Sequence, residues 1–298
     1  MLWNGHRVPF TLLGGYLGAG KTTIVNHVVR NAGGRRIVVL VNDVAAVNID
    51  AALIADHDGT TLSLSNGCVC CSIADDFAQT LEQIRAMSEA PDHVLMELSG
   101  VGEPERVVPW ANTTGFRLDG IVVAADADQI DELADRPFVG DTIGAQLRAA
   151  DLVVLTKSDL AADGGSVARR RIQTFSSAPI VDVVNGAIDV DVLIGLGSPT
   201  GVSGETGRMR ALPVEHGEYP DHHATRLIEL GSVTHEELSS IVDSLPVDVI
   251  RAKALVRCSD VAPPVEVHVV GKRRTIRPRP DLDQAVAAQA MVVITVVA

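Results

Sequence analysis

The stretch Gly14-Gly-Tyr-Leu-Gly-Ala-Gly-Lys-Thr-Thr23 decides the fold of this chain of 298 residues. From Gly15 it reads G-x-x-x-x-G-K-T, the pattern of a loop whose backbone amides surround phosphate groups. Apolar residues at 8–13 predict a strand before the loop, and those at 24–29 predict a helix after it. Lys21 would reach the β- and γ-phosphates, and the Thr22 hydroxyl would bind Mg²⁺. A glycine-rich turn without a ligand is the alternative, but the Lys-Thr pair in register favours nucleotide binding.

Composition narrows the class of partner. The chain has 25 Lys and Arg against 38 Asp and Glu, for a net charge of −13, and only 3% aromatic residues. Such a surface repels phosphate backbones and offers few stacking platforms, so we expect no nucleic-acid partner. No basic segment with an apolar run opens the chain, and the apolar tail at 285–298 is too short to span a bilayer. We therefore expect a cytoplasmic protein with no membrane partner.

Downstream of the loop, short apolar segments alternate with helical ones. This pattern predicts an α/β fold with a mostly parallel sheet covered by helices. A helix is expected over residues 75–89, where Phe77, Leu81 and Ile84 share one face. Further strands are expected at residues 36–41, 93–98, 120–125, 152–155 and 180–184.

Glycine and proline interrupt the pattern between residues 195 and 221. We expect a nucleotide-binding domain over 1–200, a linker over 201–224 and a small α+β domain over 225–298. In that second domain the predicted order is a strand at 225–230, a helix at 236–244, strands at 249–257 and 265–269, and a core strand in the apolar tail.

A short motif after a buried strand indicates which base is bound. Thr156-Lys157-Ser158-Asp159 resembles the guanine-specifying N/T-K-x-D motif. A carboxylate at Asp159 would accept two hydrogen bonds from guanine, which adenine does not offer, while the Lys157 stem would lie along the purine face. Thr156 stands where Asn is commoner, and a simple helix cap is the alternative.

The strand at 93–98 carries a carboxylate near its end. Glu97 is expected to contact Mg²⁺ directly or through water, and Gly100 to approach the γ-phosphate with its backbone amide. A solvated glutamate at a strand terminus is the alternative.

Three of the four cysteines fall within the run Cys68-Val-Cys70-Cys71. Thiolates in such a cluster suit zinc or cobalt, with an outside ligand to complete the site. Burial as small hydrophobic residues fits Cys258 but fits the cluster poorly.

Other residues are weaker metal candidates. Asp43 and Asp50 follow the second strand, where a mobile switch is expected, and spacing does not decide which metal each serves. His216, His222 and His223 lie in the polar linker and are better interpreted as solvated loop residues.

Taken together, these motifs resemble the CobW family of GTPases, relatives of the nickel chaperones HypB and UreG. The likeness also includes Glu97-Leu-Ser-Gly-Val-Gly-Glu-Pro104 and the downstream Val249-Ile-Arg-Ala-Lys-Ala254. It implies a P-loop GTPase domain, a CobW-type C-terminal domain, and delivery of Zn²⁺ or a related cation to a client metalloprotein. It further implies that Cys70 and Cys71 bind metal together with Asp43.

The chain departs from the family pattern at two places. The switch reads Asn42-Asp43-Val44-Ala45-Ala46, where the family commonly has a glycine and a second acid. The long His-rich loop of many members is reduced to the three sparse histidines, which makes metal storage doubtful.

The resulting hypothesis is a GTPase that couples its nucleotide state to metal release. Its turnover is expected to be slow, because no arginine finger or catalytic glutamine is identifiable. The expected catalytic residues are Lys21, Thr22, Asp50 and Glu97. The expected Mg²⁺ ligands are Thr22, Asp50 and Glu97, and the expected Zn²⁺ or Co²⁺ ligands are Asp43, Cys68, Cys70 and Cys71. The nucleotide, GTP or GDP, is expected to contact Gly15, Gly18, Ala19, Gly20, Lys21, Thr22, Thr23, Gly100, Thr156, Lys157 and Asp159.

Two other functions stay open at this point. One is a GTPase assembly factor for a metal- or cobalamin-dependent enzyme that carries no metal itself, with the cysteines serving structure or client contact. The other is a small-molecule kinase, which an ATP preference would favour. A nucleotide-dependent homodimer is a further possibility.

Overall fold

The computed structural model describes residues 3, 7–42, 61–64, 73–195, 223–280 and 289–296. The chain divides into two compact units, Met1–Ile194 and Gly195–Ala298.

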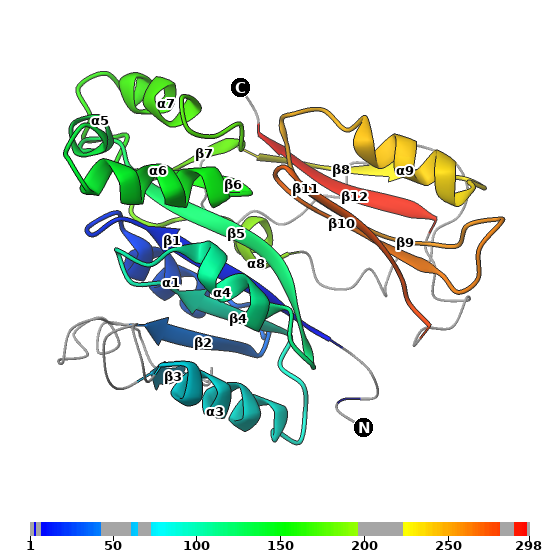
Figure 1. Cartoon of the computed structure of the whole chain (residues 1–298). Helices are drawn as coiled ribbons and strands as arrows, with labels where there is room; N and C mark the ends of the chain where they lie inside the picture. The colour runs from blue at the N-terminus through cyan, green and yellow to red at the C-terminus, as the bar shows by residue number, and fades with distance from the viewer. Residues whose placement is uncertain are drawn as a thin grey trace. The chain divides into compact units, whose positions relative to one another are not determined.

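The first unit alternates strands and helices along the chain (Figure 1). Its elements are β1 (Val8–Gly15), α1 (Lys21–Arg30), β2 (Ile37–Asn42), β3 (Thr61–Leu64), α3 (Ile73–Arg85), β4 (His93–Glu97), α4 (Pro104–Ala111), β5 (Phe116–Asp126), α5 (Ile130–Ala134), α6 (Val139–Ala149), β6 (Leu152–Thr156), α7 (Ser166–Gln173), β7 (Ile180–Val183) and α8 (Val190–Ile194).

The described strands of this unit form one seven-stranded sheet in the order β3-β2-β4-β1-β5-β6-β7. Every neighbouring pair is parallel. The carboxyl ends of all strands therefore lie at one edge, with Leu13 opposite Glu97 and Asp126 opposite Thr156. In open parallel sheets this edge, where the strand order reverses, is where ligands bind. The predicted α/β class is confirmed.

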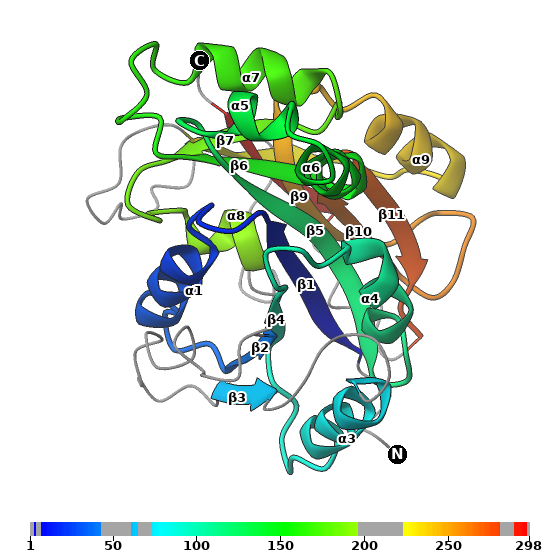
Figure 2. The same cartoon turned by 60° about the vertical axis from the view of Figure 1, so that its left-hand side comes forward.

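Helices cover both faces of the sheet, because strands buried on both sides need partners above and below. Phe10 and Leu12 of β1 belong to a core that also includes Phe77 and Leu81 of α3 and Leu147 of α6. Thr11 points the other way, and its Oγ1 lies 3.4 Å from the carbonyl oxygen of Leu193 in α8. Figure 2 shows α1 and α8 on one side of the sheet and α4 and α6 on the other.

Strand β5 is longer than predicted, because it begins at Phe116 and not at residue 120. Arg117 and Asp119 interrupt the apolar pattern there, yet both are buried, and Arg117 Nη1 lies 3.5 Å from Asp119 Oδ1. The residues 116–118 pair with the start of β1. An ion pair within the strand thus allows charged residues to occupy a buried position, which the apolar pattern does not reveal.

In its described residues, the second unit is an antiparallel sheet with one helix. Its described strands form a five-stranded sheet in the order β11-β10-β9-β12-β8. The elements are β8 (His223–Glu229), α9 (His235–Asp243), β9 (Val249–Val256), β10 (Val265–Val270), β11 (Arg273–Pro278) and β12 (Ala290–Val296). The apolar tail does form a core strand, since β12 lies between β9 and β8 and buries Met291 and Val293. The predicted α+β class of this part is confirmed, and β11 is an addition.

Among the described residues, no helix is both long and apolar enough to cross a membrane.

Candidate nucleotide site

The phosphate loop joins β1 to α1 through glycines that no other residue can replace without strain. Gly15 has φ 134° and Gly18 has φ 79°, values that side-chain-bearing residues rarely adopt. A Cβ on Gly15 would also lie 2.4 Å from the carbonyl oxygen of Ala124 in β5. Gly20, with φ 84°, is the N-cap of α1. The loop therefore presents bare backbone at the N-terminus of a helix, where the dipole favours an anion.

Lys21 is the first residue of α1, and its side chain turns back over the loop. Its Nζ donates to the carbonyl oxygens of Gly15 at 2.9 Å and Tyr16 at 3.2 Å, and the residue is buried. The backbone N–H of Ala19 donates to the same Tyr16 oxygen at 3.2 Å, which closes the turn. A buried ammonium group beside the backbone of a glycine-rich loop forms a site that suits a polyphosphate.

Thr22 follows on the same helix and contacts the carboxylate of the neighbouring strand. Its Oγ1 donates to Glu97 Oε1 at 2.9 Å, and Glu97 is buried at the end of β4. Hydroxyl and carboxylate oxygens are the ligands that Mg²⁺ prefers, so this pair fits a magnesium ion shared with a phosphate. Asp50, the third expected ligand, lies outside the described residues.

The segment after β4 lies directly against the phosphate loop. A Cβ on Gly100 would come within 2.8 Å of the backbone nitrogen of Leu17, so only glycine allows this approach. Gln146 of α6 holds the segment from behind, with Nε2 at 3.2 Å from the Gly100 oxygen and 2.9 Å from the Gly102 oxygen. Sequence reasoning did not find Gln146, because it lies in a helix that carries no motif.

The Thr156-Lys157-Ser-Asp159 motif meets the phosphate loop at the end of β6. Thr156 Oγ1 lies within hydrogen-bond distance of the carbonyl oxygens of Ala19, at 3.0 Å, and Ala125, at 3.1 Å. Lys157 Nζ donates to the Gly18 oxygen at 3.0 Å and to Asp126 Oδ2 at 2.7 Å. Thr156 and Lys157 thus brace the loop, while Asp159 is exposed beyond the strand end.

Asp126 is a second residue that the sequence analysis did not single out. It ends β5, is buried, and receives the Lys157 ammonium group. A signal was available, since a carboxylate directly follows the predicted strand at 120–125, much as Glu97 lies near the end of the predicted strand at 93–98.

A hollow of ≈ 390 Å³ lies along the exposed side of α1 beside the loop after β7. A Cβ on Gly186 would come within 2.9 Å of the Thr23 backbone, which shows how closely this loop approaches the start of α1. Burial lowers the pKa of His27 in this hollow, opposed by its hydrogen bond to the Ile188 backbone. The lining residues are Thr22, Thr23, Asn26, His27, Arg30 and Asn185.

The predicted transition-metal ligands cannot be placed. Asp43, Cys68, Cys70 and Cys71 lie outside the described residues, as do His216 and His222, and of His223 only the backbone is described. Within the described ranges, no group of three or more His, Cys, Asp or Glu side chains is arranged to hold a metal. Strand β2 ends at Asn42, and its Val41 pairs with Glu97, so the last described residues before the expected switch lie beside the strand that carries Glu97.

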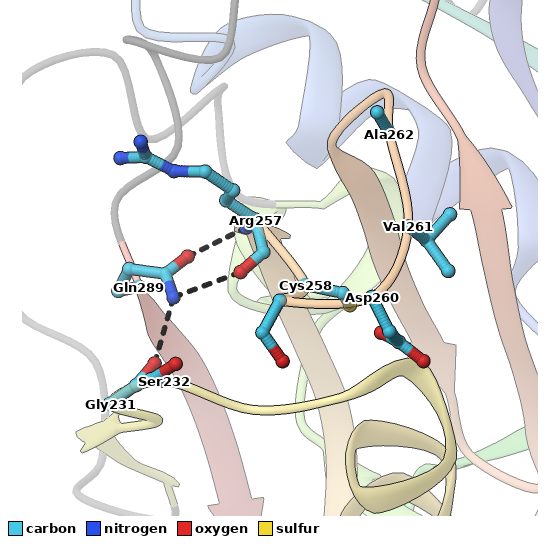
Figure 3. Close-up of a pocket in the computed structure, with 9 residues that line it drawn as sticks. Gly231, Ser232, Arg257, Cys258, Asp260, Val261, Ala262 and Gln289 are labelled. Carbon is cyan, nitrogen blue, oxygen red and sulfur yellow. Dashed lines mark hydrogen bonds between the residues drawn. The ribbon is translucent and has the colours of Figure 1, made fainter.

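The second unit has a hollow of its own, of ≈ 680 Å³, near Cys258 (Figure 3). The Gln289 side chain lines it, accepting from the Arg257 N–H at 2.6 Å and donating to the Gly231 oxygen at 2.7 Å. Cys258 is buried, and burial together with the nearby Asp260 charge raises the pKa of its thiol. This thiol therefore stays protonated, which supports its interpretation as a small buried hydrophobic residue.

The fold and the loop geometry define a class, the P-loop nucleotide-binding proteins. The model of the family "CobW/HypB/UreG, nucleotide-binding domain" matches residues 9–183. The chain belongs to this family, and it is a P-loop GTPase.

Three relatives illustrate the range of the likeness. The zinc chaperone CobW of Sinorhizobium sp is 30% identical over 266 residues, which cover 77% of this chain and 75% of that protein. The zinc-regulated GTPase metalloprotein activator 1 of Schizosaccharomyces pombe is 33% identical over 196 residues, which cover 61% of this chain and 47% of that protein. The crystal structure of the Zn(II)-bound YjiA GTPase from E. coli aligns with 98% of this chain and 95% of its own, at 18% identity and a TM-score of 0.45.

Proposed function

We propose that this GTPase is a metallochaperone that couples its nucleotide state to the binding and release of Zn²⁺, or a related cation such as Co²⁺, to a client metalloprotein. Bound GTP orders the switch and the metal site together, and hydrolysis to GDP and phosphate loosens both.

The nucleotide half of the proposal rests on the edge of the parallel sheet. The phosphate loop supplies backbone amides and Lys21 for the phosphates. The exposed carboxylate of Asp159 would accept hydrogen bonds from the guanine. Mg²⁺, when bound, would be held by Thr22, Glu97 and Asp50 and would neutralise charge on the phosphates. Turnover is expected to be slow without a partner, because the motifs supply neither an arginine finger nor a catalytic glutamine.

The pairing of β2 with β4 is the observation that carries the coupling. Val41 lies opposite Glu97, so the chain that continues to Asp43 and Asp50 starts beside the Thr22–Glu97 pair. Asp43, Cys70 and Cys71 would form the cargo site, with Cys68 close by in sequence. Two relatives carry names that refer to zinc, which supports the choice of cargo.

The second candidate is an assembly factor that activates a metal- or cobalamin-dependent enzyme without carrying metal. The activator name of the Schizosaccharomyces pombe relative supports this alternative. In that case the cysteines would contact the client or stabilise the fold, and nucleotide would leave metal affinity unchanged.

Equilibrium dialysis of Zn²⁺, Co²⁺ and Ni²⁺ against the full chain separates the two candidates. We expect Zn²⁺ or Co²⁺ affinity to be about tenfold or more higher with a non-hydrolysable GTP analogue and Mg²⁺ than with GDP, the ratio of a typical allosteric coupling. The double variant Cys70→Ser/Cys71→Ser should lose both the affinity and its nucleotide dependence, because the hydroxyl is a poor ligand for these cations.

Cys258→Ala is the matched control, because it removes a thiol that is buried in the second unit and is not deprotonated. It should bind metal as the unaltered chain does. Unchanged, nucleotide-dependent metal binding in the double variant would show that the cargo site lies elsewhere, and metal affinity independent of nucleotide in the unaltered chain would favour the assembly factor.

A further inference from the structure

Gln146 is a buried polar residue that contacts a segment of the nucleotide site from the neighbouring helix. It lies in α6, is 1% exposed, and its Nε2 points to the carbonyl oxygens of Gly100 at 3.2 Å and Gly102 at 2.9 Å. A carboxamide nitrogen carries two hydrogens, so one side chain can serve both carbonyls. Because a buried amide without partners is costly, this arrangement favours a single position of the segment.

Fixing these carbonyls fixes the amides on the same peptide planes. The peptide unit is planar and trans, so its N–H points opposite to its C=O. Gln146 therefore sets the direction of the N–H groups of Val101 and Glu103. A turn orients the preceding peptide plane, which carries the Gly100 N–H, because the Ser99 oxygen of that plane accepts from the Gly102 N–H at 2.8 Å. Three contacts thus orient the backbone N–H groups of Gly100, Val101 and Glu103, while the Gly102 N–H is used in the turn.

The oriented segment lies where a terminal phosphate would be sensed. Gly100 is packed on Leu17 of the phosphate loop so closely that a Cβ would meet the Leu17 nitrogen at 2.8 Å. The segment also begins three residues after Glu97, which contacts Thr22. Helix α6, which carries Gln146, is followed along the chain by β6. Thr156 at the end of β6 and Lys157 directly after it contact the phosphate loop.

We propose that Gln146 is a positioning residue that holds residues 100–103 ready to bind the γ-phosphate, and so sets the preference of the site for GTP over GDP. This inference rests on the proposed placement of the nucleotide. Gln146 touches no nucleotide itself, and it acts through the direction of the backbone N–H groups. Its effect should appear with the triphosphate, because GDP has no γ-phosphate for these groups to bind.

The test is isothermal titration of the full chain with Mg²⁺ and either GDP or a non-hydrolysable GTP analogue. In Gln146→Met, which has similar length and no donors, we expect the analogue to bind about tenfold more weakly while the affinity for GDP is retained. kcat for GTP should fall as well. If this variant does not fold, Gln146→Asn keeps the carboxamide but shortens it by one carbon, and it should show the same selective loss.

The matched control is Gln173→Met on the exposed surface of α7, which should change neither affinity. A structural role alone would lower the fraction of active sites or weaken both nucleotides equally, and either result, like unchanged affinities, would overturn the proposal. Lys21→Ala tests the placement of the nucleotide site separately from the role of Gln146. If Lys21→Ala still binds both nucleotides with unchanged affinity, the nucleotide site lies elsewhere and the proposed function itself fails.

Discussion

At the scale of single residues, Lys157 is the point where the guanine motif and the phosphate loop meet. Its backbone has φ 58°, an unfavourable value for a lysine that costs about 1 kcal/mol. The side chain offsets this cost by contacting the Gly18 oxygen and the buried carboxylate of Asp126. The strained backbone then lets the chain turn so that Asp159 is exposed two residues later.

Asp159 carries a prediction about base selectivity. In Asp159→Ala we expect the preference for GTP over ATP to fall about tenfold to a hundredfold, because the two guanine donors lose a charged acceptor. Competition of each nucleotide against a fluorescent GDP analogue measures the ratio. Asp128→Asn, at another exposed acid near the same edge, should leave it unchanged. Equal selectivity in Asp159→Ala would mean that this motif does not read the base.

At the scale of elements, α9 shows how a local sequence signal fixes the start of a helix. The Thr234 Oγ1 accepts from the Glu237 N–H at 3.2 Å, and Glu237 Oε2 accepts from the Thr234 N–H at 2.8 Å. These reciprocal bonds form a capping box. The Thr234 N–H and, at 3.0 Å, the Thr234 hydroxyl both donate to Glu237 Oε2, and these two donors lower the pKa of Glu237 because they favour the ionised carboxylate.

Removing this cap should weaken the second unit. We expect Thr234→Ala to lower the free energy of unfolding by about 1 kcal/mol, measured by urea titration at pH 7. The Glu237 contribution is present above its usual pKa of 4.5 and is lost as the pH falls through the lowered pKa of the folded chain. The difference between Thr234→Ala and the unaltered chain should therefore shrink as the pH falls below that usual value.

Ser240→Ala provides the control, because it removes a hydroxyl from the exposed interior of the same helix, where alanine is favourable. It should leave stability unchanged or raise it slightly. A loss in Ser240→Ala equal to that in Thr234→Ala would contradict the capping role.

At the scale of the whole molecule, the chain divides into two units, and the described residues of each unit bury apolar side chains of their own. The first unit is organised around the parallel sheet, and the second has its own cluster, which includes Leu238, Val256 and Val267. The nucleotide site described above lies within the first unit. A ligand that binds only the folded first unit should stabilise that unit by mass action.

Differential scanning calorimetry of the full chain tests this division. We expect two transitions. GDP with Mg²⁺, at a hundred times the dissociation constant, should stabilise the first unit by about 2.7 kcal/mol and so raise the midpoint temperature of one transition. Thr234→Ala should lower the midpoint temperature of the other transition. A single transition that responds to both changes would show instead that the two cores unfold as one cooperative unit.

Much of the candidate site follows from local patterns. The phosphate loop, Glu97 and the Thr156–Asp159 motif each sit at a predicted strand end, and parallel strands bring such ends to one edge. Asp43 and the cysteines at 68–71 remain predictions, because they lie outside the described residues. The start of β5 does not follow from the sequence, because Arg117 and Asp119 interrupt the apolar pattern there, and only their ion pair makes a buried strand possible.

The sequence by itself determined the class of this protein, because glycines at positive φ, a lysine in register and a strand before a helix are local requirements of a phosphate loop. Only the tertiary structure decided which residues support that loop. Gln146 is 46 residues from Gly100, and Lys157 is 139 residues from Gly18. Such contacts depend on the order of strands in the sheet, which is set by packing between distant segments and leaves no periodicity in the chain.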